Sequence, residues 1–434
     1  MIVRKISPAV CVLAILFLVS CVSAAAQTPS GAEKQFSLRD GDHVVFYGDS
    51  ITEQRLYTMA VEEYVVTRFP DLHITFFNAG VGGDKVSGGW AGPIDLRLQT
   101  DLFAHEPTVI TVMLGMNDGY YRPYDALVFK TYADGYHYLV DQMISQTPKA
   151  RLVLIQPSPY DDVTREPSIV GGYNTVLQRY STFVGELARE KNAQAVDFNQ
   201  PVVDVLTKAK TIDAPLSTRL IPDRVHPSLS IHWIMAESLL KTWNAPPVVT
   251  AVTVHADRVA SSDEVNTKVT DLRKASRSIA WTQADRALPL PFPPGELDPA
   301  IDLALRSSDL LAALDQENLK VLGLAGGNYE LRIDDFLVGV FGADALSAGI
   351  NLATLDTPME QQARLVGMDA ELRNRLEGDH LSLTRDTSKD AQTQAAHELE
   401  LLLDKAMDRE RKDAQPVVHH YSLTPVANGK MGAQ

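Results

Sequence analysis

The stretch that decides the fold is His43-Val44-Val45-Phe46-Tyr47-Gly48-Asp49-Ser50. Its apolar beginning predicts a short strand, its Gly-Asp-Ser end predicts a loop, and Leu56 to Phe69 predicts the helix that follows. The same order recurs before residue 245, with further strands expected at His73–Phe77, Thr108–Leu114, Arg151–Gln156 and Ala193–Phe198. Because strands that alternate with helices imply βαβ crossovers, we predict an α/β fold. We expect a three-layer αβα sandwich around a five-stranded parallel sheet in flavodoxin-like order.

Composition excludes several classes of protein. The chain has 434 residues, of which 45% are hydrophobic and 22% charged, and its formal net charge is −15. This is an ordinary globular composition, which argues against a collagen-like, disordered or polytopic membrane protein. An acidic protein repels phosphate backbones, so we expect no nucleic-acid partner. At about 100–200 residues per domain, the length favours two domains.

Residues 1–26 have the layout of a secretory signal peptide: a basic start, an apolar core and small residues up to Ala26. We therefore expect an exported protein, periplasmic or extracellular and of bacterial type. The sequence Leu18-Val19-Ser20-Cys21 also resembles a bacterial lipobox, which leaves open cleavage after Ala26 or lipidation of Cys21. Membrane attachment is expected only in the second case. Both cysteines, Cys11 and Cys21, lie in this segment, so the mature chain should contain no disulfide and no Cys-based metal site.

The pattern changes after Ala245-Pro246-Pro247, which we take as a boundary. The predicted domains are residues 36–245 and residues 248–434. For the second we expect an α+β region, with short strands at about 319–341 and helices at about 358–413. The region contains no catalytic constellation. We favour a β-rich piece with helices packed against the first domain or a partner, rather than a glycan-binding sandwich. Trp281 is expected to be buried, and residues 422–434 to form a frayed tail.

Four loops carry unusual residues. Three follow the carboxyl ends of the first three strands, where open parallel sheets bind ligands. They are Gly48-Asp49-Ser50-Ile51, Asn78-Ala79-Gly80-Val81-Gly82-Gly83-Asp84 and Gly115-Met116-Asn117-Asp118-Gly119. The fourth precedes the last helix of the domain and is Asp223-Arg224-Val225-His226-Pro227. Each loop alone has an ordinary explanation as a turn or a helix cap.

The residue types in these loops suit nucleophilic catalysis. A serine is a nucleophile at neutral pH only beside a base, and imidazole is the natural base. Asp223 precedes His226 by three residues and can reach its other ring nitrogen. Glycine lets the backbone present N–H groups, and the Asn117 amide is a neutral donor for an oxyanion. We interpret Asp161-Asp162 as a solvated loop pair rather than a cation site, and we expect no metal and no cofactor.

In combination, the four loops resemble those of the SGNH hydrolase family, also called GDSL esterases and lipases, over about residues 40–245. The resemblance is greatest to exported bacterial carbohydrate acetylesterases with a C-terminal extension. It implies that Ser50 is the nucleophile, His226 the base and Asp223 the orienting acid. It also implies an oxyanion hole made of the Ser50 N–H, the Gly83 N–H and the Asn117 side chain. Met116 departs from the pattern, because a small residue often stands there, and it would narrow the pocket.

The resemblance predicts an exported serine esterase that hydrolyses carboxylic esters through an acyl-enzyme. Activity should rise with pH as His226 loses its proton. Aromatic residues near the loops suit a sugar, which favours O-acetyl groups on a sugar or polysaccharide. They are Trp90, Tyr120, Tyr121, Tyr124 and Tyr160. They suit an acyl chain too, so a lipase-like or arylesterase-like enzyme of lipid or small esters stays open. A non-catalytic glycan-binding protein is the third alternative, although a pure binder needs no such serine, histidine and aspartate. The expected partner is a small-molecule or glycan ester, and the sequence gives no oligomeric state.

Overall fold

The central sheet has the predicted topology. A computed structural model describes residues 35–292, 298–385 and 391–426. Five parallel strands lie in the order β2-β1-β5-β6-β7, which confirms the flavodoxin-like α/β sandwich. They are β1 (His43–Gly48), β2 (Thr75–Gly80), β5 (Val109–Met113), β6 (Arg151–Gln156) and β7 (Gln194–Asp197).

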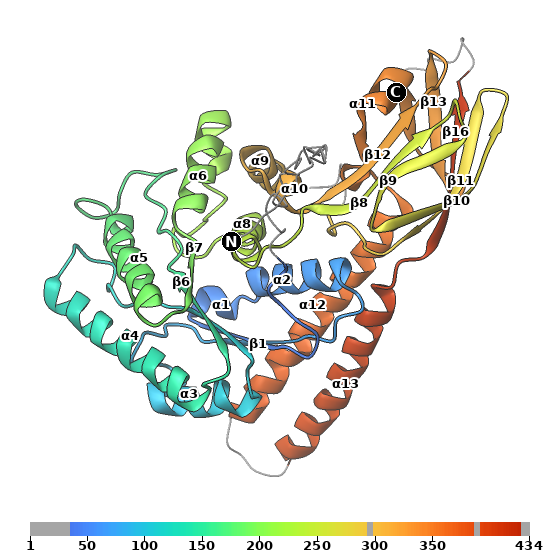
Figure 1. The fold of residues 1–434 in the computed structure, drawn as a ribbon. Helices are drawn as coiled ribbons and strands as arrows, with labels where there is room; N and C mark the ends of the chain where they lie inside the picture. The colour runs from blue at the N-terminus through green and yellow to red at the C-terminus, as the bar shows by residue number, and fades with distance from the viewer. Residues whose placement is uncertain (1–34, 293–297, 386–390, 427–434) are drawn as a thin grey trace, which may run out of the picture. The chain divides into compact units, whose positions relative to one another are not determined.

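Helices cover both faces of this sheet (Figure 1). On one face lie α2 (Leu56–Arg68) and α8 (Leu229–Thr242), and on the other lie α3 (Ile94–Asp101), α4 (Ala126–Gln146) and α5 (Tyr173–Glu190). The central strands are continuous apolar runs because both of their faces are buried, as is usual for parallel sheets. The first three loops singled out above follow the carboxyl ends of β1, β2 and β5.

Short elements connect this framework to the candidate site. The helix α1 (Ser50–Glu53) follows β1 directly, and the two-residue strands β3 (Gly88–Gly89) and β4 (Gly92–Pro93) form a small hairpin before α3. After β7, α6 (Gln200–Ile212) and α7 (Ala214–Ser217) lead into the loop that contains Asp223 and His226. A single turn, η1 (Phe103–His105), precedes β5.

Two further sheets make up most of the C-terminal region. One has the order β10-β11-β16-β13-β14 and the other the order β15-β12-β8-β9. Their strands are β8 (Val248–His255), β9 (Ala260–Val265), β10 (Thr267–Ala275), β11 (Ser278–Asp285), β12 (Gln316–Leu322), β13 (Asn328–Ile333), β14 (Phe336–Gly342), β15 (Ile350–Asn351) and β16 (Val418–Pro425). The two sheets share a hydrophobic core of their own, in which Trp281 is buried and stacks on Tyr421 with ring centroids 5.1 Å apart.

The expected frayed tail is wrong for its first residues. Residues 422–425 belong to β16, which pairs with β11 on one side and with β13 on the other. The reason lies in an alternation that starts earlier in the chain, since His419, Tyr421 and Leu423 are buried while the residues between them face outward. Residues 427–434 lie outside the described residues, as do residues 1–26 with Cys11 and Cys21.

Helices of the C-terminal region pack on the first domain. The chain passes through α9 (Pro299–Ser307) and α10 (Leu310–Leu314), whose apolar residues join the core of the parallel-sheet domain. After α11 (Ala343–Ala348) and the short turn η2 (Leu352–Thr354), α12 (Pro358–Arg385) and α13 (Ala391–Asp413) lie side by side. α12 also packs on α2. The domain boundaries given above stay predictions.

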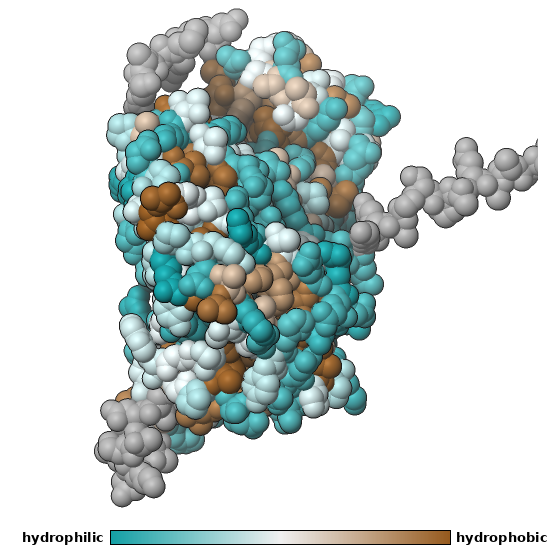
Figure 2. All heavy atoms as spheres, turned by 90° about the vertical axis from the view of Figure 1, so that its left-hand side faces the viewer, coloured by the Kyte–Doolittle hydropathy of each residue, from teal (hydrophilic) through white to brown (hydrophobic). Residues whose placement is uncertain are grey.

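The surface is mixed in character. On the face shown in Figure 2, hydrophobic residues form separate small patches among hydrophilic ones. Within the described ranges, no helix is both long enough and apolar enough to span a bilayer.

Candidate active site

Ser50 stands where β1 turns into α1. The Asp49 carboxylate accepts a hydrogen bond from the Ile51 N–H at 3.0 Å, which caps the helix and fixes the turn. The Ser50 hydroxyl oxygen lies 2.9 Å from Nε2 of His226. The Ser50 N–H is at the first position of a helix, where backbone donors have no partner within the helix. The turn therefore presents both a hydroxyl and an N–H at the carboxyl edge of the sheet.

His226 is held on its other side by Asp223. Nδ1 of His226 lies 2.6 Å from Oδ2 of Asp223, and the N–H groups of Val225 and His226 donate to Oδ1 at 2.9 and 2.7 Å. Burial acts to raise the pKa of Asp223, but the hydrogen bonds from His226 and Val225 outweigh it and lower that pKa. Asp223 is thus kept ionised. Because its carboxylate can only accept from Nδ1, Nε2 is left to accept the Ser50 proton.

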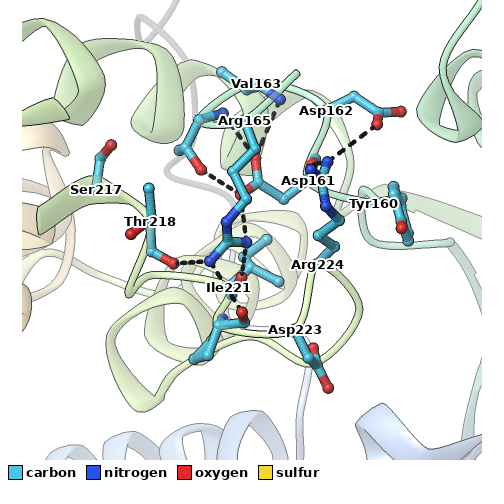
Figure 3. A network of polar contacts seen from close by, with 12 residues as sticks. Tyr160, Asp161, Asp162, Val163, Arg165, Ser217, Thr218, Ile221, Asp223 and Arg224 are labelled. Carbon is cyan, nitrogen blue, oxygen red and sulfur yellow. Dashed lines mark hydrogen bonds and ion pairs between the residues drawn. The ribbon is translucent and has the colours of Figure 1, made fainter. Parts of the chain in front are cut away.

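A network of polar contacts holds the loop that carries Asp223 and His226 (Figure 3). The Arg165 guanidinium donates to the backbone carbonyls of Thr218, Ile221 and Pro222 at 2.7–2.9 Å. Arg224 has a φ of 74°, and its guanidinium donates to the Asp161 carbonyl at 2.9 Å. Arg165 thereby fixes the backbone immediately before Asp223, a role that its place in the sequence does not reveal.

Asp161 corrects the expectation of a solvated loop pair. It is fully buried, and its carboxylate accepts from the N–H groups of Val163 and Thr164 at 3.1 and 2.8 Å. The Asp161 N–H donates to the Arg224 carbonyl at 2.9 Å. A backbone hydrogen bond therefore joins the Asp161 loop to the loop that carries Asp223 and His226. Asp162 is also engaged, because it accepts the Asn174 N–H at the start of α5. Among the described residues, no group of three or more His, Cys, Asp or Glu side chains is arranged to hold a metal ion.

The loop after β2 brings Gly83 toward the same edge. Gly83 has a φ of +72°, which L residues rarely adopt, and a Cβ there would meet the Trp90 ring at 3.2 Å. Gly80 allows a close approach of a different kind, because a Cβ would stand 2.2 Å from the Glu53 nitrogen of α1. The loop therefore packs directly on the turn that presents Ser50.

Asn117 ties the third loop to the second. Its Nδ2 donates to the Asp84 carbonyl at 3.0 Å, and its Oδ1 accepts from the Tyr121 hydroxyl at 2.9 Å. These two contacts fix which way the amide faces and leave it a second N–H. Met116, which was expected to narrow the pocket, has a side chain only 1% exposed that belongs to the hydrophobic core.

A buried arginine, Arg97, forms hydrogen bonds that hold the Gly-rich loop. Arg97 of α3 is fully buried, donates to Asp84 Oδ2 at 2.8 Å and to the Ala79 carbonyl at 2.7 Å, and pairs with Asp101. Its guanidinium also lies 4.7 Å from the centre of the Tyr47 ring. A lone arginine in an amphipathic helix gives no signal of this role in the sequence.

Two other aspartates of the site differ from Asp223. Burial raises the pKa of Asp49 to about 7 and that of Asp118 to about 7. Asp118 accepts the Val86 N–H at 3.1 Å, and Asp49 caps α1. Both carboxyl groups make structural contacts, and burial favours their neutral form.

Four of the five aromatic side chains expected near the site are exposed. Trp90 is 87% exposed and lies against Gly82 and Gly83. Tyr120, Tyr121 and Tyr124 are also exposed. Tyr160 is half-buried and contacts Tyr121 with ring centroids 6.2 Å apart. The Trp90 ring thus offers a flat apolar surface beside the Gly-rich loop.

The geometry as a whole defines a class. An imidazole that is hydrogen-bonded to a serine hydroxyl on one side and to a carboxylate on the other can take the hydroxyl proton. The serine oxygen can then attack an acyl carbonyl. This is the arrangement that a hydrolase with a serine nucleophile requires.

Comparison with known proteins agrees with this class. Residues 46–234 match the model of the GDSL-like lipase/acylhydrolase family. The chain is accordingly an ester-hydrolysing enzyme. It is 26% identical over 221 residues to an acetylxylan esterase of Geobacillus stearothermophilus, in an alignment that covers 46% of this chain and 93% of that one. The solved structure of a gut microbial diltiazem-metabolizing enzyme has the same fold, with 24% identity and a TM-score of 0.78 over 91% of this chain and 100% of that one.

Proposed function

We propose that this chain is a serine esterase that removes O-acetyl groups from a sugar or polysaccharide. In this proposal Ser50 is the nucleophile, His226 the general base and Asp223 the group that orients the imidazole. The observation that carries it is the series of hydrogen bonds from the Ser50 hydroxyl to His226 at 2.9 Å and from His226 to Asp223 at 2.6 Å. A non-catalytic glycan-binding protein would need no such series.

The first chemical step is acyl transfer to Ser50. Nε2 of His226 takes the hydroxyl proton as the oxygen attacks the ester carbonyl, and the imidazolium is stabilised by Asp223. The tetrahedral intermediate collapses when the alcohol leaves with the proton from His226. A water molecule then attacks the acyl-enzyme and gives a proton to His226. The second tetrahedral intermediate collapses as His226 returns this proton to the Ser50 oxygen, which releases the acid and free Ser50.

The oxyanion of the intermediate needs donors on the opposite side from His226. We assign this role to the N–H groups of Ser50 and Gly83 and to Nδ2 of Asn117. The positive φ of Gly83 and the two hydrogen bonds that orient the Asn117 amide support the assignment. A donor of this kind typically contributes about 3–4 kcal/mol to the stability of the transition state.

Two features support an acetylated sugar as the substrate. One is the similarity to an acetylxylan esterase. The other is the exposed Trp90 beside Gly83, since an exposed indole ring stacks well on a sugar. An exported enzyme would meet such polymers, and we propose export on the pattern of residues 1–26, with Cys21 as a lipid attachment point in the alternative processing.

The experiment that tests the proposal is hydrolysis of p-nitrophenyl acetate and p-nitrophenyl octanoate by the native chain and by Ser50→Ala. We expect turnover by the native chain, loss of turnover in the variant and a preference for acetate. Ser238→Ala is a matched control, because that hydroxyl bonds to the Ile234 carbonyl within α8.

Acetate release from acetylated xylan then tests the substrate class. Release by the native chain but not by Ser50→Ala supports a carbohydrate acetylesterase. A preference for octanoate, with no release from the polymer, would favour a lipase-like enzyme. Turnover that survives in Ser50→Ala would refute the nucleophile.

A further inference from the structure

A carboxylate from the C-terminal region reaches the edge of the parallel sheet. Glu377 of α12 is 6% exposed, and its Oε1 accepts the Asn78 N–H at 2.9 Å. β2, which contains Asn78, is an edge strand, so N–H groups on its outer side have no neighbouring strand to bond to. Glu377 supplies the partner that a further strand would otherwise provide.

The same carboxylate also contacts the segment behind the nucleophile. Oε1 of Glu377 lies 3.1 Å from the Arg55 guanidinium. Arg55 has a φ of 64°, stands between α1 and α2, and its N–H donates to the Thr52 carbonyl at 2.9 Å. Glu377 therefore touches both the strand that leads to Gly83 and the residue that ends the turn begun by Ser50.

Asn78 connects these two contacts. Its side chain donates to the Thr52 carbonyl of α1 at 2.7 Å, and its Oδ1 accepts the Gly80 N–H at 3.0 Å. One residue thus bonds the Ser50 helix, the start of the Gly-rich loop and, through its backbone, Glu377. A shift of the Asn78 backbone would move the Ser50 turn and the Gly83 loop relative to each other.

Charged neighbours keep Glu377 in place. Its Oε2 accepts from the Arg373 guanidinium at 3.0 Å. Arg373 also pairs with Glu62 of α2 and lies 3.6 Å from Glu410 of α13. These four residues are at most 6% exposed, so the cluster is a buried contact between α2, α12 and α13 rather than a surface ion pair.

From these contacts we propose that Glu377 is a positioning residue of the esterase site. It holds the Asn78 backbone and Arg55 so that the N–H groups of Ser50 and Gly83 face one substrate oxygen. The proposal rests on the function proposed above, and it makes the C-terminal region a part of the catalytic framework although it supplies no group that touches substrate.

The test compares two pairs of variants in the full chain, Glu377→Asp with Glu377→Gln and Glu62→Asp with Glu62→Gln. Asp at position 377 keeps the charge beside Arg373 but is too short to reach the Asn78 N–H. We expect roughly a tenfold fall in kcat for p-nitrophenyl acetate with KM unchanged, since misplacement by about 1 Å can cost up to about a hundredfold. Gln keeps the length and an acceptor oxygen, so its kcat should fall less, by a few-fold.

The Glu62 variants are the matched control. Glu62 shares Arg373 with Glu377 but contacts neither Asn78 nor Arg55 in the hydrogen bonds and ion pairs of the described residues. Its variants should lower the melting temperature while kcat stays native. Equal loss of kcat in both pairs would mean that the cluster only stabilises the fold, which would overturn the proposal.

Native kcat in folded Glu377→Asp would overturn it as well. Should the Asp variant not fold, Glu377→Gln decides alone, and native kcat there contradicts the proposal. The native chain and Ser50→Ala are assayed alongside. An inactive native chain refutes the esterase function and the positioning role together, whereas an active native chain with unaffected Glu377 variants refutes the positioning role alone.

Discussion

The loop that carries Asp223 and His226 is held from within its own domain, whereas the turn that carries Ser50 is also held by a helix that begins at Pro358. After the roles proposed above, we call the loop of Asp223 and His226 the base side, and the Ser50 turn with β2 and its following loop the nucleophile side. On the base side, Arg165 binds backbone carbonyls of a surface loop. On the nucleophile side, the buried charged groups of Arg97 and Glu377 bind β2 and the loop that follows it.

The two sides differ in electrostatics as well. Asp223 is 56% exposed at its side chain and its pKa is lowered, so it stays charged. Asp49 and Asp118 are buried, which raises their pKa values to about 7. The base side therefore relies on a charge near water, whereas the nucleophile side combines buried ion pairs with two carboxyl groups, Asp49 and Asp118, whose neutral form burial favours. The difference suggests that substitutions on the base side act on proton transfer, and substitutions on the nucleophile side act on geometry.

The largest effect expected on the base side is that of Asp223→Asn. An amide at this position would permit the wrong imidazole tautomer, so kcat should fall by about 10⁴-fold. Loss of the nucleophile in Ser50→Ala should cost more, on the order of 10⁶-fold. Steady-state kinetics with p-nitrophenyl acetate measures both. An Asp223→Asn variant within tenfold of native kcat would show that the carboxylate does not orient His226.

On the nucleophile side, the largest effect after Ser50 itself should come from Asn117→Ala. Loss of one oxyanion donor should lower kcat by about 10²–10³-fold and leave KM little changed, because the bond forms in the transition state. Unchanged melting temperature would separate this loss from unfolding. If KM rises while kcat stays native, Asn117 binds the ground state and is not an oxyanion donor.

Most of the first domain could be predicted from the sequence, because its strands and functional loops are encoded by patterns within short segments of the chain. The central strands β1 and β5 are nearly continuous apolar runs, and three of the four functional loops directly follow a strand. Ser50, Asn117, Asp223 and His226 lie in short segments whose order along the chain limits where they can stand. The sheet brings their loops to one edge, and the structure places Ser50, His226 and Asp223 in hydrogen-bond contact.

The supporting residues could not be predicted in the same way. Arg165 acts on carbonyls more than 50 positions away, and Glu377 on an N–H group 299 positions away. Neither residue stands in a motif, and both look like ordinary charged residues of a loop or a helix. In the C-terminal region, β9 and β10 were missed because their residues are mostly half-buried or exposed, with little apolar contrast. The strands β8 and β11 were missed as well, although they contain regularly buried residues.

A smaller effect on the base side is expected from Arg165→Met. It removes the donors to the Thr218, Ile221 and Pro222 carbonyls, so the Asp223 loop should loosen. We expect about a tenfold fall in kcat, within the range that misplacement by up to 1 Å produces. Arg306→Met is the matched control, since Arg306 pairs with Asp302 on an exposed helix surface. Equal effects of the two variants would deny Arg165 a role at the site.

The smallest expected effect is on the pH dependence of the free energy of unfolding. The two sides of the site should contribute to it with opposite sign, because the pKa of Asp118 is raised and that of Asp223 is lowered. The ordinary pKa of an aspartate is 3.8, and burial raises that of Asp118 to about 7. The unfolded chain releases this proton near pH 4, whereas the folded state keeps it up to about pH 7. The free energy of unfolding therefore falls as pH rises through this window. Asp49 and, in the C-terminal region, Asp315 act in the same direction.

Melting temperature should accordingly be higher at pH 5 than at pH 7.5, and Asp118→Asn should reduce the difference by a few degrees. The variant keeps an oxygen for the Val86 N–H but cannot ionise. Asp223→Asn serves as the contrast. Its folded-state pKa is lowered, so its stabilisation is present above the unfolded value and is lost only as pH falls below that range. Removing it should leave the change between pH 5 and 7.5 as it is. A slope that responds to Asp223→Asn but not to Asp118→Asn would reverse the assignment of charge to the two sides of the site.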